Sequence, residues 1–144
     1  MSMNHDLKLC ENCLKYETYF ELREAVDWKN FCREQAETAV ENSTYSVVVK
    51  DEDRDIAMGR VVGDGMYFTI VDVVVRPEYQ GKGIGSMIIG KILLHIEIGL
   101  PSGSRASIQL LSEKGKEGFY LKQGFKLIPH EFCGPALRKV IYMQ

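Results

Sequence analysis

The fold of this chain is decided by one stretch, Asp72-Val73-Val74-Val75-Arg76-Pro77-Glu78-Tyr79-Gln80-Gly81-Lys82-Gly83-Ile84-Gly85-Ser86. Its three consecutive valines are typical of a central strand buried on both faces. Pro77 ends that strand, and apolar residues at i, i+3 and i+4 from Ile84 onward predict a long helix. A strand that passes through glycines into a helix presents backbone N–H groups where the helix dipole attracts phosphate.

Two common phosphate-binding motifs do not match this loop. The nucleotide P-loop requires G-x-x-x-x-G-K-[ST], but Lys82 is followed by Gly83, and no glycine stands five residues before Gly81. The dinucleotide fingerprint requires G-x-G-x-x-G, and its third glycine is missing whether the motif starts at Gly81 or at Gly83. The loop therefore favours a different phosphate-bearing ligand.

Strands and helices are predicted along the whole chain from hydrophobic periodicity and turn residues. The expected strands are 7–13, 44–50, 56–62, 66–75, 106–111, 125–128 and 136–143. The expected helices are 18–26, 28–40, 84–98 and 114–123. The short turns at 51–53 and 63–65 predict antiparallel hairpins. The order β-α-α-β-β-β-α-β-α-β-β indicates an α/β fold around a mixed sheet.

Length and composition limit the classes of protein that remain. The chain has 144 residues and is expected to form a single domain, 1–144. A formal charge of −2 argues against nucleic acid as a partner. The sequence contains no apolar run long enough to span a membrane and no secretory signal in Met1–Leu9, so we expect no membrane partner and a cytoplasmic location. Cys10, Cys13, Cys32 and Cys133 are expected to be reduced structural thiols, and no metal set is visible.

The glycine loop resembles the donor-binding motif of the GNAT superfamily of N-acetyltransferases, [QR]-x-x-G-x-[GA] after a V-x-P-type strand end. The segment Phe119–Phe125, FYLKQGF, resembles a second family motif, F-Y-x-K-x-G-F, which closes the acetyl-CoA site. The resemblance is clear from about Thr44 to Ile128. It implies a twisted, mixed sheet of about seven strands with about four helices, splayed open after the strand that ends at Val75.

The resemblance also implies acetyl-CoA as the acetyl donor, with no metal. The pantetheine arm would bond to the backbone of Val73 and Val75, and a backbone N–H of Val73 or Val74 would stabilise the oxyanion. The pyrophosphate would lie on the N–H groups of the glycine loop. The expected donor-binding residues are Val73, Val74, Val75, Gln80, Gly81, Lys82, Gly83, Ile84, Gly85 and Ser86. Many relatives carry an Asn before the tyrosine helix, and this chain has none in 112–118.

Two residues are candidates for proton transfer. Tyr120 occupies the position of the family's tyrosine general acid, and a phenol with a pKa of about 10 stays protonated at neutral pH. The alternative is a tyrosine packed beside Phe119 and Phe125. Asp72 is the candidate base, acting directly or through water, and it is expected to share a strand face with Val74. The alternative is an aspartate that orients a loop or the substrate amine.

The acceptor site is expected between the first two helices, the middle strands and the loop before the last strand. The predicted acceptor-binding residues are Tyr19, Trp28, Tyr67 and Phe132, with Leu22, Arg23, Phe68 and the Gly134-Pro135 turn nearby. Alternatively these residues pack helices on the sheet, as we expect of Leu22 and Phe31.

The favoured function is acetylation of a primary amine on a small molecule. Two alternatives remain: acetylation of protein or peptide amines, and a non-catalytic module that senses acetyl-CoA. The family also suggests a homodimer.

Overall fold

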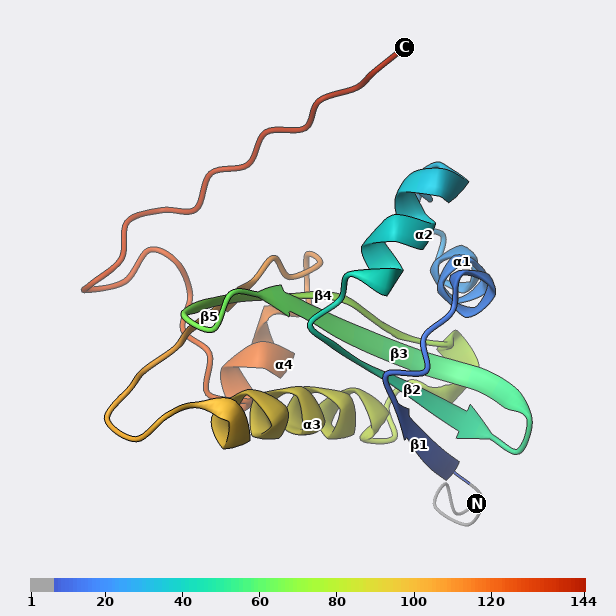
Figure 1. The fold of residues 1–144 in the computed structure, drawn as a ribbon, viewed down its shortest axis with the longest axis horizontal. Helices are drawn as coiled ribbons and strands as arrows, with labels where there is room; N and C mark the ends of the chain where they lie inside the picture. Colours follow the sequence, from blue (N-terminus) through green and yellow to red (C-terminus); the bar gives the residue numbers. More distant parts are fainter. Residues whose placement is uncertain (1–6) are drawn as a thin grey trace. The chain divides into compact units, whose positions relative to one another are not determined.

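The computed structural model describes residues 7–144 (Figure 1). Most of the N-terminal stretch in which no secretory signal was expected lies outside this range. The described chain forms two compact units, one that ends at Leu110 and one from Leu111 to Gln144. The expectation of one domain stays a prediction.

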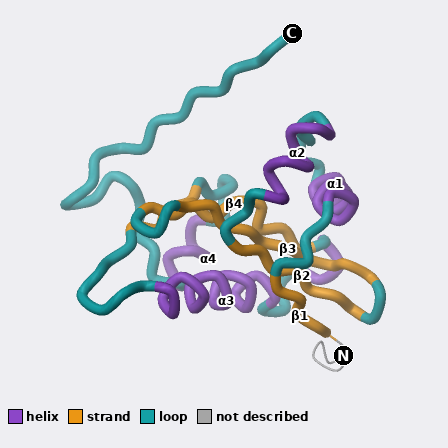
Figure 2. Tube along the Cα trace, in the orientation of Figure 1, coloured by secondary structure: helices purple, strands orange, loops and turns teal. Residues whose placement is uncertain are grey.

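A five-stranded mixed sheet forms the centre of the first unit. Its strands follow chain order: β1 (Leu7–Glu11), β2 (Tyr45–Asp51), β3 (Arg54–Gly63), β4 (Tyr67–Val75) and β5 (Ser107–Leu110). The first four pair antiparallel, which confirms the two predicted hairpins. β5 pairs parallel to β4 over Tyr67–Ile70, so this half of β4 is internal (strands are orange in Figure 2). The valines predicted a strand buried on both faces, but Val71, Val73 and Val75 lie beyond the pairing with β5 and are half-buried.

Helices cover both faces of this sheet. α1 (Tyr16–Ala25) and α2 (Arg33–Glu41) lie on one face and α3 (Ile84–Gly99) on the other (Figure 1). On the first face, Tyr19 and Leu22 pack against Met58 and Val74 in a buried cluster. The second predicted helix begins later than expected, because residues 28–32 form a connection in which Trp28 packs on that cluster.

The second unit contains α4 (Glu117–Lys122) and little other regular structure. The strands expected over 125–128 and 136–143 are absent from it, and residues 129–144 are all exposed. Isolated strands are not stable, and neither segment finds a hydrogen-bonded partner strand in this structure. Among the described residues the sheet therefore has five strands rather than about seven, although the mixed α/β class is confirmed.

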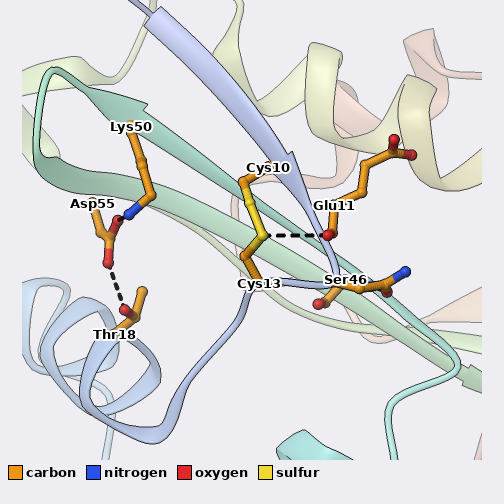
Figure 3. Close-up of a disulfide and its surroundings, with 8 residues drawn as sticks. Cys10, Glu11, Cys13, Thr18, Ser46, Lys50 and Asp55 are labelled. Atoms are coloured by element: carbon orange, nitrogen blue, oxygen red, sulfur yellow. Dashed lines mark hydrogen bonds and ion pairs between the residues drawn. A yellow bond between two sulfur atoms is a disulfide. The ribbon is translucent and has the colours of Figure 1, made fainter.

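The expectation of reduced thiols at Cys10 and Cys13 is wrong. The two residues form a disulfide at the end of β1, and their Cα atoms lie 5.8 Å apart (Figure 3). That separation lies within the range that a disulfide requires, and the tight turn after β1 creates it. Cys32 and Cys133 are free and exposed.

Gly59 allows β3 and α3 to approach closely, which leads to a stability prediction. A Cβ at Gly59 would lie 2.5 Å from Cγ2 of Ile88. We expect Gly59→Ala to lower the free energy of unfolding by about 1–3 kcal/mol through overpacking. Gly90 in α3 is the control, because a Cβ there meets nothing within 4 Å. Gly90→Ala should raise stability by about 0.5–1 kcal/mol through helix propensity. Urea unfolding measures both, and equal effects of the two substitutions would contradict the close packing.

Candidate active site

The glycine loop forms an open helix N-terminus. α3 begins at Ile84, and the preceding Gly83 has φ +85°, while Gly81 has φ +77°. Glycine adopts this left-handed conformation at little cost. A Cβ at either position would meet nothing within 4 Å, and no side chain caps the helix. The first-turn N–H groups of α3 thus follow glycines with open surroundings, an arrangement that favours an anion at the helix N-terminus.

Hydrogen bonds anchor this loop to the sheet. The side-chain amide of Gln80 donates to the carbonyl oxygen of Val75 at 2.9 Å, across the short 3-10 helix Pro77–Tyr79. Nε of Arg76 donates to the carbonyl oxygen of Asp55 at 2.8 Å. Glutamine in the motif therefore ties the loop to the end of β4, which holds the start of α3 in a defined place.

β4 loses its neighbour halfway along. β5 pairs with β4 from Tyr67 to Ile70, where Ile70 lies opposite Leu110. Beyond Ile70, no strand of the described chain pairs with that edge of β4. The chain beyond Leu110 belongs to the second unit, so the splay that the family resemblance implied stays a prediction. A free strand edge offers backbone groups to an extended ligand, in the manner of an added strand.

A β-bulge lies in the same part of β4. Val71 pairs with Arg60 and Val74 with Met58, so Asp72 and Val73 together lie opposite the single residue Gly59. Asp72 has φ +55°, which is the left-handed conformation that a bulge can require. Asp72 and Val74 both face α1, as expected from strand alternation, whereas the side chain of Val73 lies on the α3 side, near Gly59.

The carboxylate of Asp72 is held between two arginines. Nη1 of Arg23 in α1 donates to Oδ1 at 2.6 Å, and Nε of Arg60 in β3 donates to Oδ2 at 2.8 Å. The side chains are 7% exposed for Asp72 and 11% for each arginine. Both oxygens of the expected base thus already accept charge-assisted hydrogen bonds. This geometry fits the alternative in which Asp72 orients a neighbouring segment.

Arg60 was missed at the sequence level, and one signal could have revealed it. An arginine within the apolar run 56–62 must lie in a buried strand, and buried arginines are almost always paired. Arg23 was considered only as a residue near the acceptor. Its guanidinium lies 5.3 Å from the ring centroids of Trp28 and Phe31 and 5.5 Å from that of Tyr19, at cation–π distance.

The predicted acceptor residues divide into buried and exposed sets. Tyr19 is 1% exposed, so it belongs to the core, and burial followed by the charge of Asp72 raises its pKa. Trp28 is half-buried against Arg23. In contrast, Tyr67 is 65% exposed and, in the second unit, Phe132 is 84% exposed. Leu22 is buried as expected.

Two other candidates differ from expectation. Phe31 is 53% exposed, which contradicts the prediction that it packs the helices on the sheet, whereas Phe68, considered near the acceptor, is buried.

Tyr120 lies in α4 of the second unit. Its ring contacts Phe119 and Phe125 edge-on, with centroid distances of 4.9 and 6.0 Å. Burial raises the pKa of Tyr120 above its usual value, and the negative charge of Glu113 adds to the rise. The ring contacts match the interpretation of Tyr120 as a packing residue. The raised pKa, which keeps the phenol protonated, is also compatible with the interpretation of Tyr120 as a general acid.

Across residues 7–144, no three His, Cys, Asp or Glu side chains gather in a way that could hold a metal ion. Of the helices that the structure describes, none is long and apolar enough to cross a membrane.

Comparison with known proteins identifies relatives for both the sequence and the fold. The chain is 32% identical over 114 residues to serotonin N-acetyltransferase 2 of rice, across 74% of this chain but 55% of that protein. A probable acetyltransferase of unknown function from Staphylococcus aureus is 31% identical with a TM-score of 0.81, covering 93% of this chain and 99% of its own. A GNAT-family acetyltransferase from Streptococcus pneumoniae is 27% identical with a TM-score of 0.74, covering 96% and 98% respectively.

A family model decides the assignment. The model described as an acetyltransferase (GNAT) domain matches residues 42–127, more than half of the chain. That range includes the glycine loop, the bulge in β4 and Tyr120. The chain spans only about half the length of the rice enzyme. The architecture, the open helix terminus and these matches lead to one conclusion: the chain belongs to the GNAT family of acetyltransferases.

Proposed function

We propose that this chain transfers an acetyl group from acetyl-CoA to the primary amine of a small molecule, which attacks the thioester directly. One combination of features carries the proposal: β4 has a free edge beyond Ile70, and the loop that follows it leads into an open helix N-terminus. We name the loop residues 81–86 the phosphate cradle. Acetyl-CoA carries an extended pantetheine arm and a pyrophosphate, which match those two features.

The chain offers binding groups for each part of the donor. The N–H groups from Gly81 to Ser86 would hold the pyrophosphate at the start of α3. The backbone of Val73 and Val75 would bond to the pantetheine amides along the free edge of β4. Lys82 is exposed and adds a positive charge beside the cradle. The pyrophosphate and the pantetheine arm would both bind to backbone groups, so neither contact requires a side chain that already has another partner.

The chemistry would depend on two groups of the chain. Acetyl-CoA supplies the acetyl group as a thioester. A backbone N–H of Val73 or Val74 would stabilise the negative charge that develops on the carbonyl oxygen. Tyr120 would give its proton to the departing thiolate, and its raised pKa keeps that proton available at neutral pH. Because both oxygens of Asp72 are occupied, the proton of the amine would leave through water.

A small amine is the proposed acceptor. The rice relative is named for serotonin, which is a small primary amine. Aromatic side chains suit such an acceptor, and the exposed Tyr67 and Phe132 and the half-buried Trp28 are the candidates. The cytoplasmic location and the homodimer stay predictions.

Calorimetric titration with acetyl-CoA tests the donor site. We expect one-to-one binding that Gly83→Asp weakens at least about tenfold, because a carboxylate at the start of α3 repels the pyrophosphate. The control is Gly103→Asp. Gly103 has φ +79° and also leaves a Cβ without neighbours, so the new side chain meets similar backbone strain. That variant should bind like the wild type.

Absence of binding by folded, coenzyme-free wild-type protein would refute the proposal. Equal weakening in both glycine variants would show that general strain, rather than the phosphate cradle, governs binding.

Tyr120→Phe tests the proton donor in a thiol-release assay over a panel of small amines. We expect kcat to fall about 10²-fold or more, with the acetyl-CoA affinity unchanged. With a folded-state pKa above the usual value of about 10, Tyr120 keeps its proton, and its contribution to activity and stability is lost only as the pH rises through that higher value. The wild-type rate should therefore show no loss due to Tyr120 below about pH 10.

The matched control for this test is Tyr142→Phe, since Tyr142 lies in the same unit and is 77% exposed. Its kcat should equal that of the wild type. An unchanged kcat in Tyr120→Phe would eliminate Tyr120 as the acid.

A further inference from the structure

We propose that Asp72 is a positioning residue, whose carboxylate holds the bulge of β4. The backbone of Val73 would then face the edge of β4 that β5 leaves unpaired beyond Ile70. This inference rests on the proposed acetyl transfer, because it gives the held backbone its task of stabilising the oxyanion. We name the three side chains Arg23, Asp72 and Arg60 the β4 clamp.

The backbone conformation at Asp72 requires something to hold it. Residues with a Cβ seldom adopt φ near +55°, and this residue stands between two runs of β-branched side chains, Thr69–Val71 and Val73–Val75. The competing arrangement is a strand without the bulge, which continues the register in which Val71 pairs with Arg60. Asp72 would then pair with Gly59 and Val73 with Met58. This would place Val73 on the α1 face and the carboxylate of Asp72 on the apolar α3 side. The two arginines bind the carboxylate only on the α1 face, so they stabilise the bulge against this alternative.

The β4 clamp also links the bulge to the segment that joins α1 and α2. Nη2 of Arg23 donates to the carbonyl oxygen of Lys29 at 2.5 Å. Nη1 of Arg60 reaches the hydroxyl of Ser43, just after α2, at 3.4 Å. The bulge is thus tied to the helices beside which the acceptor was expected, and its position depends on theirs.

The surroundings of Asp72 disfavour a role as base. Besides the two arginines, the charged or titratable side chain that faces it is Tyr19, whose hydroxyl has a raised pKa. A carboxylate that is 7% exposed and accepts a hydrogen bond on each oxygen presents little free surface to an incoming amine. Nε of Arg23 is buried without a partner, so removal of Asp72 would leave further donors unsatisfied in the same place.

Positioning and base catalysis predict different results for three substitutions of Asp72. Glycine accepts positive φ freely, asparagine tolerates it, and alanine resists it. If the conformation at residue 72 matters, Asp72→Gly should keep a kcat about tenfold above that of Asp72→Ala. Asp72→Ala should lose about 10²-fold or more, the usual effect of losing an oxyanion donor. The KM for acetyl-CoA should rise less than kcat falls, because the loop at 81–86 is separate from the bulge and only the proposed pantetheine contact at Val73 is disturbed.

Asp72→Asn keeps one acceptor oxygen and nearly the same shape, so it should fold even if the other two variants do not. We expect its kcat to fall about tenfold, as one charge-assisted bond of the clamp weakens, with the acidic limb of the pH–rate profile unchanged. A base would instead lose that limb on conversion to an amide. The control is Asp55→Asn, which removes another partly buried, ion-paired carboxylate that faces α1. It should lower stability without changing kcat.

Several outcomes would overturn the clamp: equal kcat in Asp72→Gly and Asp72→Ala, loss of the acidic limb in Asp72→Asn, or wild-type rates in all three variants. A readout independent of turnover is the amide resonance of Val73 in ¹⁵N–¹H spectra. It should move strongly in Asp72→Ala and less in Asp72→Gly, which also loses the carboxylate but still accepts positive φ. If the wild type fails to bind acetyl-CoA, the proposed function falls, but an unmoved Val73 amide in the alanine variant still refutes the clamp.

Discussion

A carboxylate between two guanidinium groups lies where the central strand of this protein leaves regular pairing. Burying three charges costs several kcal/mol for each ion, and good geometry with further hydrogen bonds is needed to offset that cost. Asp72 and its arginines meet this condition in part, with bonds of 2.6 and 2.8 Å and a further bond from Arg23 to Lys29, while Nε of Arg23 is buried without a partner. The proposed clamp therefore gives these three side chains a role in selecting one conformation rather than in adding net stability.

The rest of the site follows from where β4 is bulged and where it loses its neighbour. The bulge removes Asp72 and Val73 from regular pairing with β3, and β5 stops opposite Ile70. The same strand leads directly into the glycine loop, which Gln80 ties back to Val75. One continuous stretch of backbone therefore carries both the groups proposed for the acetyl carbonyl and those proposed for the phosphates.

Local sequence predicted those elements whose structure depends on local interactions. The hairpins, the valine-rich strand and the long helix after Ile84 were all predicted within a few residues. The predictions of strands at 125–128 and 136–143 were wrong. A strand is stable only if another strand pairs with it, and the periodicity of a segment contains no information about its partner. The disulfide between Cys10 and Cys13 was missed for a related reason, since it depends on the turn that brings the two cysteines together.

The sequence by itself determined the glycine loop, because positive φ and an uncapped helix start are properties of the residues at those positions. It also indicated Tyr120 and acetyl-CoA, through motifs that resemble those of a known family. Only the tertiary structure decided the surroundings of Asp72. The bulge between β3 and β4 sets which side chain lies beside Arg60, and Arg23, which is 49 residues away from Asp72 in the chain, reaches it only when α1 packs on the sheet. Contacts between distant residues depend on how whole elements pack, and a one-dimensional pattern cannot specify that packing.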